Sequence, residues 1–342
     1  MVILKVGSSG DQVEQVQRFL ADPARQLYSG AIDGMFGNGT RTAVIAFQTA
    51  AGLIADGIVG PLTWRLMFPS ATAATTAATT AATTAATTAA TTTATAGTPA
   101  VGQSLAWRCL SLTGSIETGL PVPGCFGGLS GNFDGQGISY GAIQWALGQG
   151  TLAPLFQKLC TQNADVVSAV FGTNAAVFTQ TFTQASHADQ MTWAIGIQTN
   201  NQVQEPWKTQ FKTLGTKAEC QALQIAMAQD RYNSALSLCR TYGLVSERAV
   251  ALMFDIMVQN GGISGTVQAQ IESDFAALGA TADETPKLEI VARRRAAACN
   301  PKWENDVLSR KMMIAQGQGT VHGAKYDLAA QYGITLNRAE GL

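Results

Sequence analysis

The chain has 342 residues, 46% of them hydrophobic and 13% charged, and its formal net charge is −1. This length predicts two domains with connecting material, because single hydrophobic cores rarely grow past about 250–300 residues. The balanced charge, without a long basic run, argues against a nucleic-acid partner.

The start of the chain predicts no export signal. Such a signal needs a basic region and an apolar stretch of roughly 7–15 residues, and Lys5 interrupts the short apolar run at the start. No segment approaches the roughly 18 consecutive apolar residues of a membrane span. We therefore expect neither a signal peptide nor an integral membrane segment.

The first 70 residues contain an internal repeat. Residues 33–40 and 56–63 both read D-G-x-x-G-x-x-T. Asp-Gly makes a tight turn, the second Gly permits a positive φ, and the Thr can cap a following helix. Side chains at helical spacing flank both copies and predict a three-helix bundle. They are Val13, Val16, Gln17 and Leu20 before the first copy, Ala43, Val44 and Phe47 after it, and Trp64 and Met67 after the second.

In order and spacing, these motifs resemble the peptidoglycan-binding domain family that accompanies many wall hydrolases. The resemblance covers nearly all of residues 3–67 and implies a shallow groove for peptide-substituted glycan. We interpret Asp33, Thr40, Asp56 and Thr63 as turn and cap residues. We expect an exposed aromatic or amide near the turns to contact the ligand.

Residues 71–96 contain only Ala and Thr. Such a segment has no large apolar groups to bury and cannot offset its own ordering entropy. We predict a disordered linker over residues 71–103, between a binding domain at 1–70 and a second domain at 104–342.

The second domain begins with a predicted amphipathic helix. Leu105, Cys109, Leu112 and Ile116 recur on one helical face, and Gly119 can end the helix in a left-handed conformation. Glu117 lies near that end. There the helix dipole and partial burial would favour the protonated carboxyl that a general acid needs.

A second carboxylate follows in a predicted hairpin. Asp134-Gly135 is a turn signal between short β-type runs, and polar residues then alternate with small ones, as in a strand lining a cleft. One protonated and one ionised carboxyl across a sugar bond are the requirement for glycoside hydrolysis. Taken singly, Glu117 would be read as a surface charge and Asp134 as a turn residue.

The stretches SIETG and FDGQGISYGAIQW resemble the catalytic helix and hairpin of family 46 glycoside hydrolases, the chitosanases, which belong to the lysozyme-like superfamily. The resemblance implies a mainly α, lysozyme-like α+β domain with a small β-hairpin. It gives Glu117 the place of the general acid and Asp134 the place of the base that activates water. Ser139 falls where the family has a Thr that helps to hold this water.

The resemblance continues downstream, where Asp255, Arg295 and Arg310 match a buried ion network that supports the acid. Asp255 interrupts a helical stripe of apolar residues (Val250, Met253, Phe254 and Met257), so it needs a cationic partner. A purely structural ion pair is the alternative for these three residues.

The expected sugar contacts are Tyr140, Gln144 and Trp145 on the hairpin, and Thr151 beyond it. Thr151 occupies the position of an acidic sugar-binding residue of the family, and residues 145–151 contain no acid. A neutral, amide-rich cleft suits N-acetylated sugars better than free amines. Together with the N-terminal domain, this departure favours peptidoglycan as the substrate.

The remaining motifs predict no cofactor. Two histidines, His187 and His322, lie 135 residues apart, so we expect no metal site. Six cysteines form no CxxC pair and are either small buried residues or members of disulfides. The Gly-rich segment 316–323 is interpreted as a loop, because the Lys-Ser/Thr of a phosphate loop is missing.

The sequence thus predicts an enzyme that hydrolyses β-1,4 bonds between the amino sugars of peptidoglycan. We expect it to be a glycosidase of the endolysin type that inverts the configuration of the anomeric carbon. A chitosanase, a lytic transglycosylase and a non-catalytic wall-binding protein are the alternatives. We expect a monomer that is made in the host cytoplasm and acts in the periplasm or at the wall after holin-type release or injection.

Overall fold

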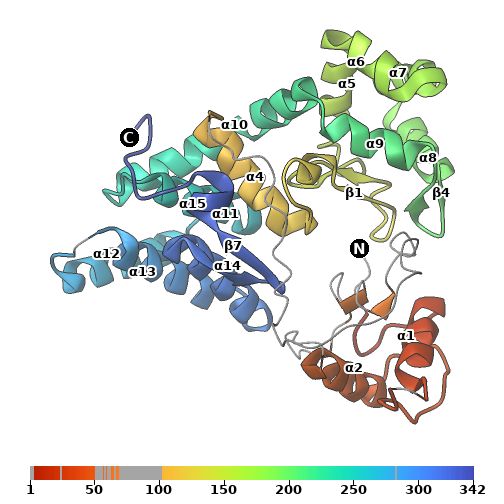
Figure 1. The fold of residues 1–342 in the computed structure, drawn as a ribbon, viewed down its shortest axis with the longest axis horizontal. Coiled ribbons are helices and arrows are strands. Elements are labelled where there is room, and N and C mark those ends of the chain that lie inside the picture. Colours follow the sequence, from red (N-terminus) through yellow and green to blue (C-terminus); the bar gives the residue numbers. More distant parts are fainter. Residues whose placement is uncertain are drawn as a thin grey trace, which may run out of the picture. The chain divides into compact units, whose positions relative to one another are not determined.

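The computed structural model describes residues 4–23, 25–50, 57, 59, 63–64, 67–68, 102–281 and 283–342. The chain divides into two compact units, Met1–Thr92 and Thr93–Leu342, and each is described by itself. The fold is mainly helical with small antiparallel sheets, as predicted (Figure 1). Asp56 and the Ala/Thr stretch of the predicted linker lie outside the described residues.

Three stretches of the first unit are helical where the sequence predicts helices. They are α1 (Asp11–Ala21), α2 (Asn38–Ala50) and, at the third predicted helix, Thr63, Trp64 and Met67. Their core consists of Leu4, Val13, Val16, Leu20, Phe36, Ala43, Val44, Val59 and Met67. The predicted apolar stripes therefore supply most of this core.

A buried glutamine on α1 holds the first Asp-Gly turn. Oε1 of Gln17 accepts from the backbone N–H of Asp33 at 3.1 Å and of Gly34 at 2.9 Å. Its Nε2 donates to Asp33 Oδ1 at 2.9 Å and to Thr40 Oγ1 at 3.3 Å. The predicted turn role of Asp33 is confirmed. Thr40, in contrast, lies inside α2 and is a buried partner of Gln17 rather than a cap.

The second copy of the repeat is held in the same way. Oε1 of Gln48, on α2, accepts from Gly57 N at 2.8 Å, and its Nε2 donates to Thr63 Oγ1 at 3.2 Å. Each copy thus pairs a glutamine from the preceding helix with a Gly N–H and a Thr hydroxyl. The sequence repeat is a repeat of tertiary contacts, so these residues hold the fold and are not free for ligand.

The described part of the second unit is mainly helical. Its helices are α4 (Leu105–Thr118), α5 (Ala153–Gln162), α6 (Ala164–Phe171), α7 (Ala175–Thr183), α8 (His187–Gly196), α9 (Trp207–Gly215), α10 (Ala218–Thr241), α11 (Glu247–Asn260), α12 (Gly265–Leu278), α13 (Thr285–Ala297), α14 (Glu304–Gln316) and α15 (Leu328–Tyr332). Short 3₁₀ turns lie at η1 (Gly124–Gly127), η2 (Gly172–Asn174) and η3 (Pro301–Trp303).

Three small antiparallel sheets complete the second unit. The first joins β1 (Leu129–Ser130), β2 (Ser139–Tyr140) and β3 (Trp145–Ala146); the second joins β4 (Gln198–Thr199) and β5 (Gln202–Val203); the third joins β6 (Gln318–Val321) and β7 (Ala324–Asp327). The Gly-rich segment 316–323 is therefore not simply the predicted loop: half of it, Gln318–Val321, forms β6, which pairs in register with residues 324–327.

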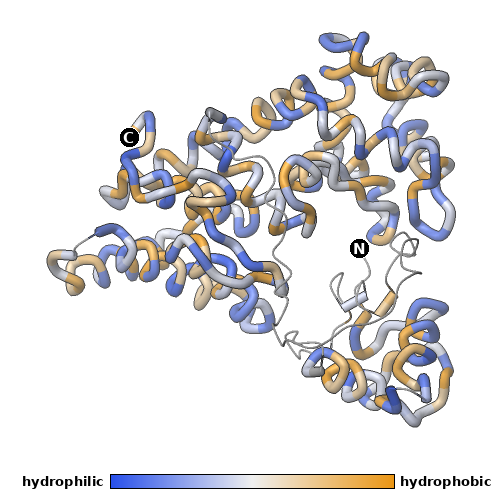
Figure 2. The backbone as a smooth tube through the Cα atoms, in the orientation of Figure 1, coloured by the Kyte–Doolittle hydropathy of each residue, from blue (hydrophilic) through white to orange (hydrophobic). Residues whose placement is uncertain are grey.

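Two groups of elements flank the centre of the second unit. We call residues 124–215, which carry η1, the first two sheets and α5–α9, the sheet lobe, and residues 247–332, which carry α11–α15, the helical lobe. Figure 1 shows the sheet lobe in yellow to green and α12–α14 in blue, with α4 and the long α10 between them. Both α4 and α10 contact α11, and α10 also contacts α5 and α9. Hydrophobic and hydrophilic segments alternate along the elements of both lobes (Figure 2), and buried hydrophobic residues of both lobes belong to one core cluster.

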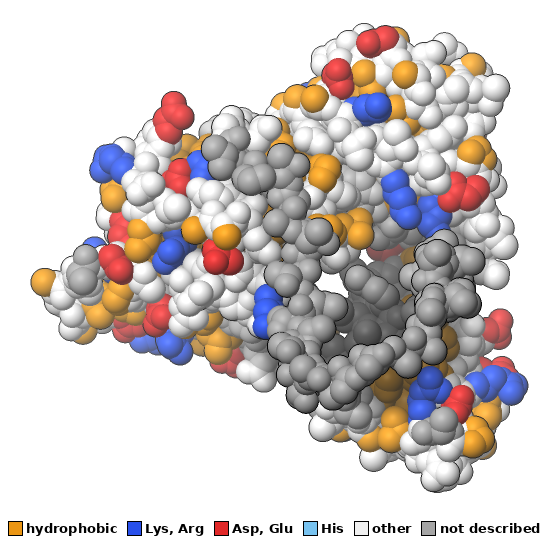
Figure 3. All heavy atoms as spheres, in the orientation of Figure 1, with side chains coloured by type: hydrophobic (Ala, Val, Ile, Leu, Met, Phe, Trp, Pro, Cys, Tyr) orange, Lys and Arg blue, Asp and Glu red, His pale blue; other side chains and the backbone are white. Residues whose placement is uncertain are grey.

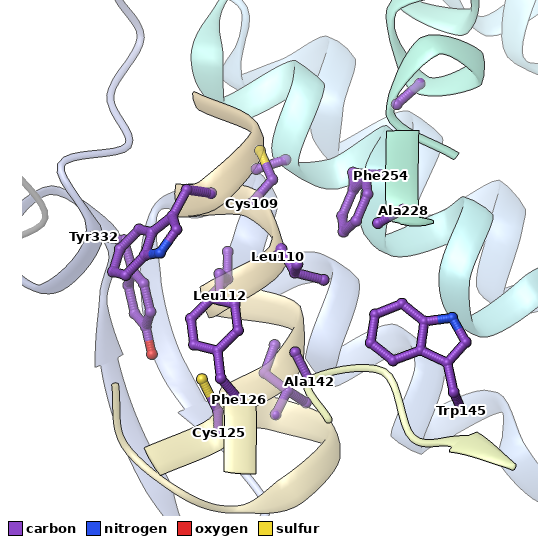
Figure 4. Packing of buried hydrophobic residues seen from close by; sticks show 14 of the residues in the cluster. Cys109, Leu110, Leu112, Cys125, Phe126, Ala142, Trp145, Ala228, Phe254 and Tyr332 are labelled. Atoms are coloured by element: carbon purple, nitrogen blue, oxygen red, sulfur yellow. The ribbon is translucent and has the colours of Figure 1, made fainter. Parts of the chain in front are cut away.

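The helix α4 runs through the core of the second unit. The predicted face is confirmed, since Leu105, Cys109, Leu112 and Ile116 are all buried, and the opposite face is buried as well. Figure 4 shows Leu110 and Leu112 of α4 packed in one cluster with Phe126 and Phe254. The hydroxyl of Ser104 caps the N-terminus, and Gly119 ends the helix with φ 66°.

All six cysteines are free thiols in the second unit, and five of them are buried. This outcome decides between the two interpretations left open by the sequence. Burial raises the pKa of Cys125 to about 12 and that of Cys220 to about 11, so these thiols are protonated apolar groups at neutral pH.

Charged side chains are scattered over the face drawn in Figure 3 and alternate with uncharged ones. Among the described residues, no helix is both long enough and apolar enough to cross a membrane.

Replacing Gln17 with Leu is expected to destabilise the first unit by about 1–3 kcal/mol. The substitution leaves buried donors of the Asp33-Gly34 turn without an acceptor, and each such group costs about this amount. Urea denaturation of the full chain, monitored by amide hydrogen exchange at Gly34, measures the loss of stability. Gln15→Leu, at an exposed position of the same helix, is the control. Equal protection of Gly34 in the two variants would contradict the role of Gln17.

Candidate active site

Glu117 lies in the last turn of α4 with its carboxyl at the edge of the protein interior. Its side chain is 29% exposed, and its Oε1 is 2.7 Å from Nη1 of Arg310, whose side chain is only 2% exposed. The carboxyl is therefore held from the protein side by a buried cation and open on its other side. The predicted position of Glu117 at the end of a helix agrees with this structure.

Behind Glu117, Asp255 forms the centre of a buried ion cluster. Its Oδ1 is 2.6 Å from Arg310 Nη2, and Arg310 Nε donates to Oδ2 at 2.9 Å. The ammonium of Lys311 pairs with the same Oδ2, and Thr113 Oγ1 donates to Oδ1 at 3.0 Å. Three helices therefore meet at one carboxylate, because Thr113 belongs to α4, Asp255 to α11, and both cations to α14.

Opposite charges in this cluster offset the free-energy cost of burying each ionised group. Burial disfavours the ionised carboxylate of Asp255, but the charges of Arg310 and Lys311 outweigh burial and hold its pKa well below the usual value. Burial likewise disfavours the guanidinium of Arg310, and Asp255 and Glu117 together raise its pKa. At Lys311, in contrast, the effect of burial is larger than the attraction of Asp255, and the pKa is lowered to about 8.

The structure corrects one predicted member of this network. Among the described contacts, Arg295 takes no part in the cluster: its Nη2 donates to the backbone oxygen of Asn260 at 3.5 Å. It lies on α13 and reaches the end of α11 rather than the middle, where Asp255 lies. The second cation is Lys311, which the sequence analysis missed. A usable signal existed, since Val307, Arg310, Lys311 and Ile314 follow the i, i+3, i+4, i+7 pattern of a buried helical face.

Asp134 lies in the loop between β1 and β2, and its side chain is exposed. Its Oδ1 accepts from Gln136 N at 3.1 Å, and Gly135 takes φ 78°, so the Asp-Gly pair forms the predicted turn. The loop follows directly from β1, which begins beside the end of α4. A Cβ at Gly128, just before β1, would collide with Thr118 of α4. The two carboxylates thus come from neighbouring elements.

Ser139 begins the middle strand of the first sheet. It pairs with Ser130 of β1 on one side and with Ala146 of β3 on the other, and its side chain is half-buried. Because side chains alternate along a strand, Ser139 and Tyr140 project to opposite faces of the sheet. Ser139 is thus on the face away from the core.

Two of the predicted sugar contacts are wrong, because their side chains are in the core. Tyr140 is 0% exposed, and its hydroxyl donates to Phe211 O at 2.9 Å. Trp145 is 5% exposed and belongs to the cluster drawn in Figure 4. The strand alternation that places Ser139 outward places Tyr140 inward, opposite Trp145 in the register.

Gln144 and Thr151 organise the backbone around the sheet. Gln144, at φ 55°, receives a hydrogen bond from Ser130 Oγ at 2.7 Å and donates through Nε2 to Gly128 O at 3.1 Å. Thr151 is exposed, and its Oγ1 accepts from Ala146 N at 2.9 Å, which closes the turn after β3. Both side chains lie beside the sheet, and both have an internal partner.

A search of the described residues finds no group of three or more His, Cys, Asp or Glu side chains that could hold a metal ion. His322 lies in the turn between β6 and β7, and its Nε2 is 2.5 Å from Asp306 Oδ1. Burial disfavours the carboxylate of Asp306, yet the hydrogen bond with His322 and nearby cations lower its pKa.

Residues 9–67 match a family model described as a putative peptidoglycan binding domain, which confirms the resemblance of the N-terminal motifs. The chain is 46% identical over 65 residues to the zinc D-Ala-D-Ala carboxypeptidase of Streptomyces albus G, and spans 26% of that protein. It is 37% identical over 73 residues to a probable N-acetylmuramoyl-L-alanine amidase of Bacillus licheniformis, and spans 21% of that protein. It thus spans far less than two thirds of either relative.

The solved structures similar to this chain include chitosanases, the family that the motifs of the second domain resemble. One chitosanase complex aligns with a TM-score of 0.41 and 18% identity over 65% of this chain and 95% of the other. A family 46 chitosanase of Gynuella sunshinyii, in complex with chitotetraose, aligns with a TM-score of 0.40 and 14% identity over 66% and 98%.

Replacing Asp255 with Asn is expected to lower the free energy of unfolding by about 3–5 kcal/mol, because it removes the buried charge that Arg310 and Lys311 share and leaves Glu117 as the remaining acidic partner of Arg310. Asp274→Asn is the control. It breaks the Arg294–Asp274 pair, whose side chains are 39% and 30% exposed, and such surface pairs contribute about 0–1 kcal/mol. Urea denaturation of both variants measures the difference, and equal losses would contradict the special status of the buried cluster.

The second unit is also expected to lose stability in acid. The pKa of Asp255 is lower in the folded state than its ordinary value of 3.8, so the unfolded chain binds more protons as the pH falls toward and below 4. The stabilisation from Asp255 is therefore complete above that value and is lost below it. Urea midpoints measured from pH 5.5 to 3 should fall more steeply in the parent chain than in Asp255→Asn. Parallel slopes would contradict this assignment.

Proposed function

We propose that the chain is a glycoside hydrolase that cleaves β-1,4 bonds between amino sugars of peptidoglycan. The observation that carries the proposal is the setting of Glu117. A buried ion cluster holds one oxygen of its carboxyl, and the side chain is still 29% exposed to solvent. Fixing a partly exposed carboxyl from within the core meets the positional requirement of a proton donor, which must lie within hydrogen-bond reach of the leaving oxygen.

In the proposed reaction, Oε2 of Glu117, the oxygen not paired with Arg310, donates a proton to the leaving glycosidic oxygen. Asp134 takes a proton from a water molecule whose oxygen attacks the anomeric carbon from the opposite face, and the Ser139 hydroxyl helps to hold this water. The bond to the leaving sugar breaks, and the configuration inverts. Asp255 and Arg310 support the acid through the ion cluster.

Two features favour peptidoglycan as the substrate. They are the N-terminal unit and the absence of acidic residues from β3 and the turn after it. Residues 9–67 match a putative peptidoglycan binding domain, and residues 145–151 contain no acid that could bind a sugar amine. A binding module on the same chain raises the effective concentration of the second domain at the wall. We propose that the chain acts in the periplasm or at the cell wall.

Product analysis on purified peptidoglycan tests the proposal. Glu117→Gln and Asp134→Asn are each expected to lower the rate by about 10²–10⁴-fold, since each removes a proton-transfer group. Glu219→Gln, at an exposed position of α10, should keep the parent rate. Mass spectrometry should show reducing amino-sugar ends, and NMR at early times should show the inverted anomer.

Each alternative gives a different product pattern. Anhydro-muramic ends that survive Asp134→Asn indicate a lytic transglycosylase, and cleavage of chitosan in preference to peptidoglycan indicates a chitosanase. Lysis of permeabilised cells by Glu117→Gln at the parent rate would leave only a wall-binding role.

A further inference from the structure

The loop that carries Asp134 is fastened at both ends by one side chain. Gln198, the first residue of β4, accepts from Asn132 N at 2.8 Å through Oε1. Its Nε2 donates to Gly137 O at 3.0 Å. These two backbone groups lie on either side of Asp134. A single amide therefore spans the base of the loop.

Gln198 itself has little freedom. Its Nε2 also donates to Ala194 O of α8 at 2.6 Å, and its backbone pairs with Val203 in the hairpin of β4 and β5. The turn of this hairpin contains two asparagines with positive φ, Asn200 at 51° and Asn201 at 57°. Two successive residues with positive φ are the mark of a tight hairpin turn that matches the strand twist. The hairpin is thus a short, well-defined support.

The loop packs closely on this support. A Cβ at Gly131 would collide with Asn201 O, and one at Gly137 would lie 3.0 Å from Met191 Sδ of α8. Across the loop, Asn132 Oδ1 accepts from Gly137 N at 2.7 Å. The loop is therefore closed internally and seated on α8 and the β4–β5 hairpin at both ends.

We infer that Gln198 is a positioning residue for Asp134, acting through the backbone of residues 132–137. The inference rests on the proposed function, in which Asp134 activates water. Asp134 is exposed, and among the described residues its side chain is held through the turn bond from Gln136 N. The place of its carboxylate relative to substrate is set by the loop ends, and both loop ends are set by Gln198.

The test compares Gln198→Leu with Gln204→Leu on purified peptidoglycan. The control removes a 2.6 Å bond from Gln204 Nε2 to Gln202 O, at an exposed position of the same hairpin. Gln198→Leu should lower kcat by about 10–100-fold with KM within about twofold, because misplaced reacting groups lose rate rather than binding. The control should keep both constants. A Gln198→Leu kcat within twofold of the parent would overturn the inference.

A double-mutant cycle separates positioning from general damage. In an Asp134→Ala background, Gln198→Leu should cost less than threefold further, since the group that it positions is already absent. The same 10–100-fold loss in that background would overturn the inference and leave the proposed function standing. Full activity of Asp134→Ala alone would overturn the proposed role of Asp134, and the inference with it.

Gln198→Glu keeps the size of the side chain and the acceptor for Asn132 N, so it tests the hydrogen bond if the Leu variant folds poorly. An ionised carboxylate cannot donate to Gly137 O, whereas a protonated one can. The ratio of variant to parent kcat should therefore rise as the pH falls through about 4–5, the ordinary range for Glu. A ratio that does not change with pH would contradict the role of the hydrogen bond from residue 198 to Gly137 O.

Discussion

The contact between Asp255 and Arg310 is the constraint on which the arrangement of the second unit depends. Both side chains are removed from water, and breaking the pair would leave buried charge poorly compensated. The pair connects the middle of α11 to the middle of α14, and Thr113 and Glu117 attach α4 to the same cluster. The three helices cannot shift past one another without separating buried charges.

The cluster need not be the most stable way to fill this space. Well-packed apolar side chains of similar volume often stabilise a core as well as a buried ion pair does, or better. What apolar side chains could not provide is an Arg310 guanidinium directed at the carboxyl of Glu117. The distinct consequence of the cluster is therefore where Glu117 is held, and this is why its setting carries the functional proposal.

The sequence predicted the elements best where a local rule decides them. The apolar face of α4, its end at Gly119 and the Asp134-Gly135 turn each depend on a few adjacent residues, and each is present in the structure. The burial of Asp255 could also be predicted, because a lone acid in an apolar stripe has no access to water.

The errors concern directions that only tertiary packing fixes. Arg295 and Arg310 both lie on helices of the helical lobe, and the buried-face pattern of α14 marks Arg310 and Lys311 as inward-facing without telling which carboxylate they reach. The alternation of polar and small residues on the hairpin predicts Tyr140 as a sugar contact, but the strand turns its side chain toward Phe211. The bonds from Gln17 to the Asp33-Gly34 turn and from Gln198 to the Asp134 loop join residues 16 to 66 positions apart in sequence, so no pattern of neighbouring residues predicts them.

The two carboxyls assigned to acid and base are fixed to different parts of the second unit. Glu117 is tied to α14 of the helical lobe, whereas the Asp134 loop is seated on α8 and β4 of the sheet lobe. The gap between them is therefore not encoded in any one motif. The distance between the two carboxyls depends instead on the relative orientation of the two lobes, so a small rotation of one lobe would change that distance. In the proposed mechanism, the rate would therefore also depend on residues at the junction of α4, α10 and α11, which lies between the two lobes.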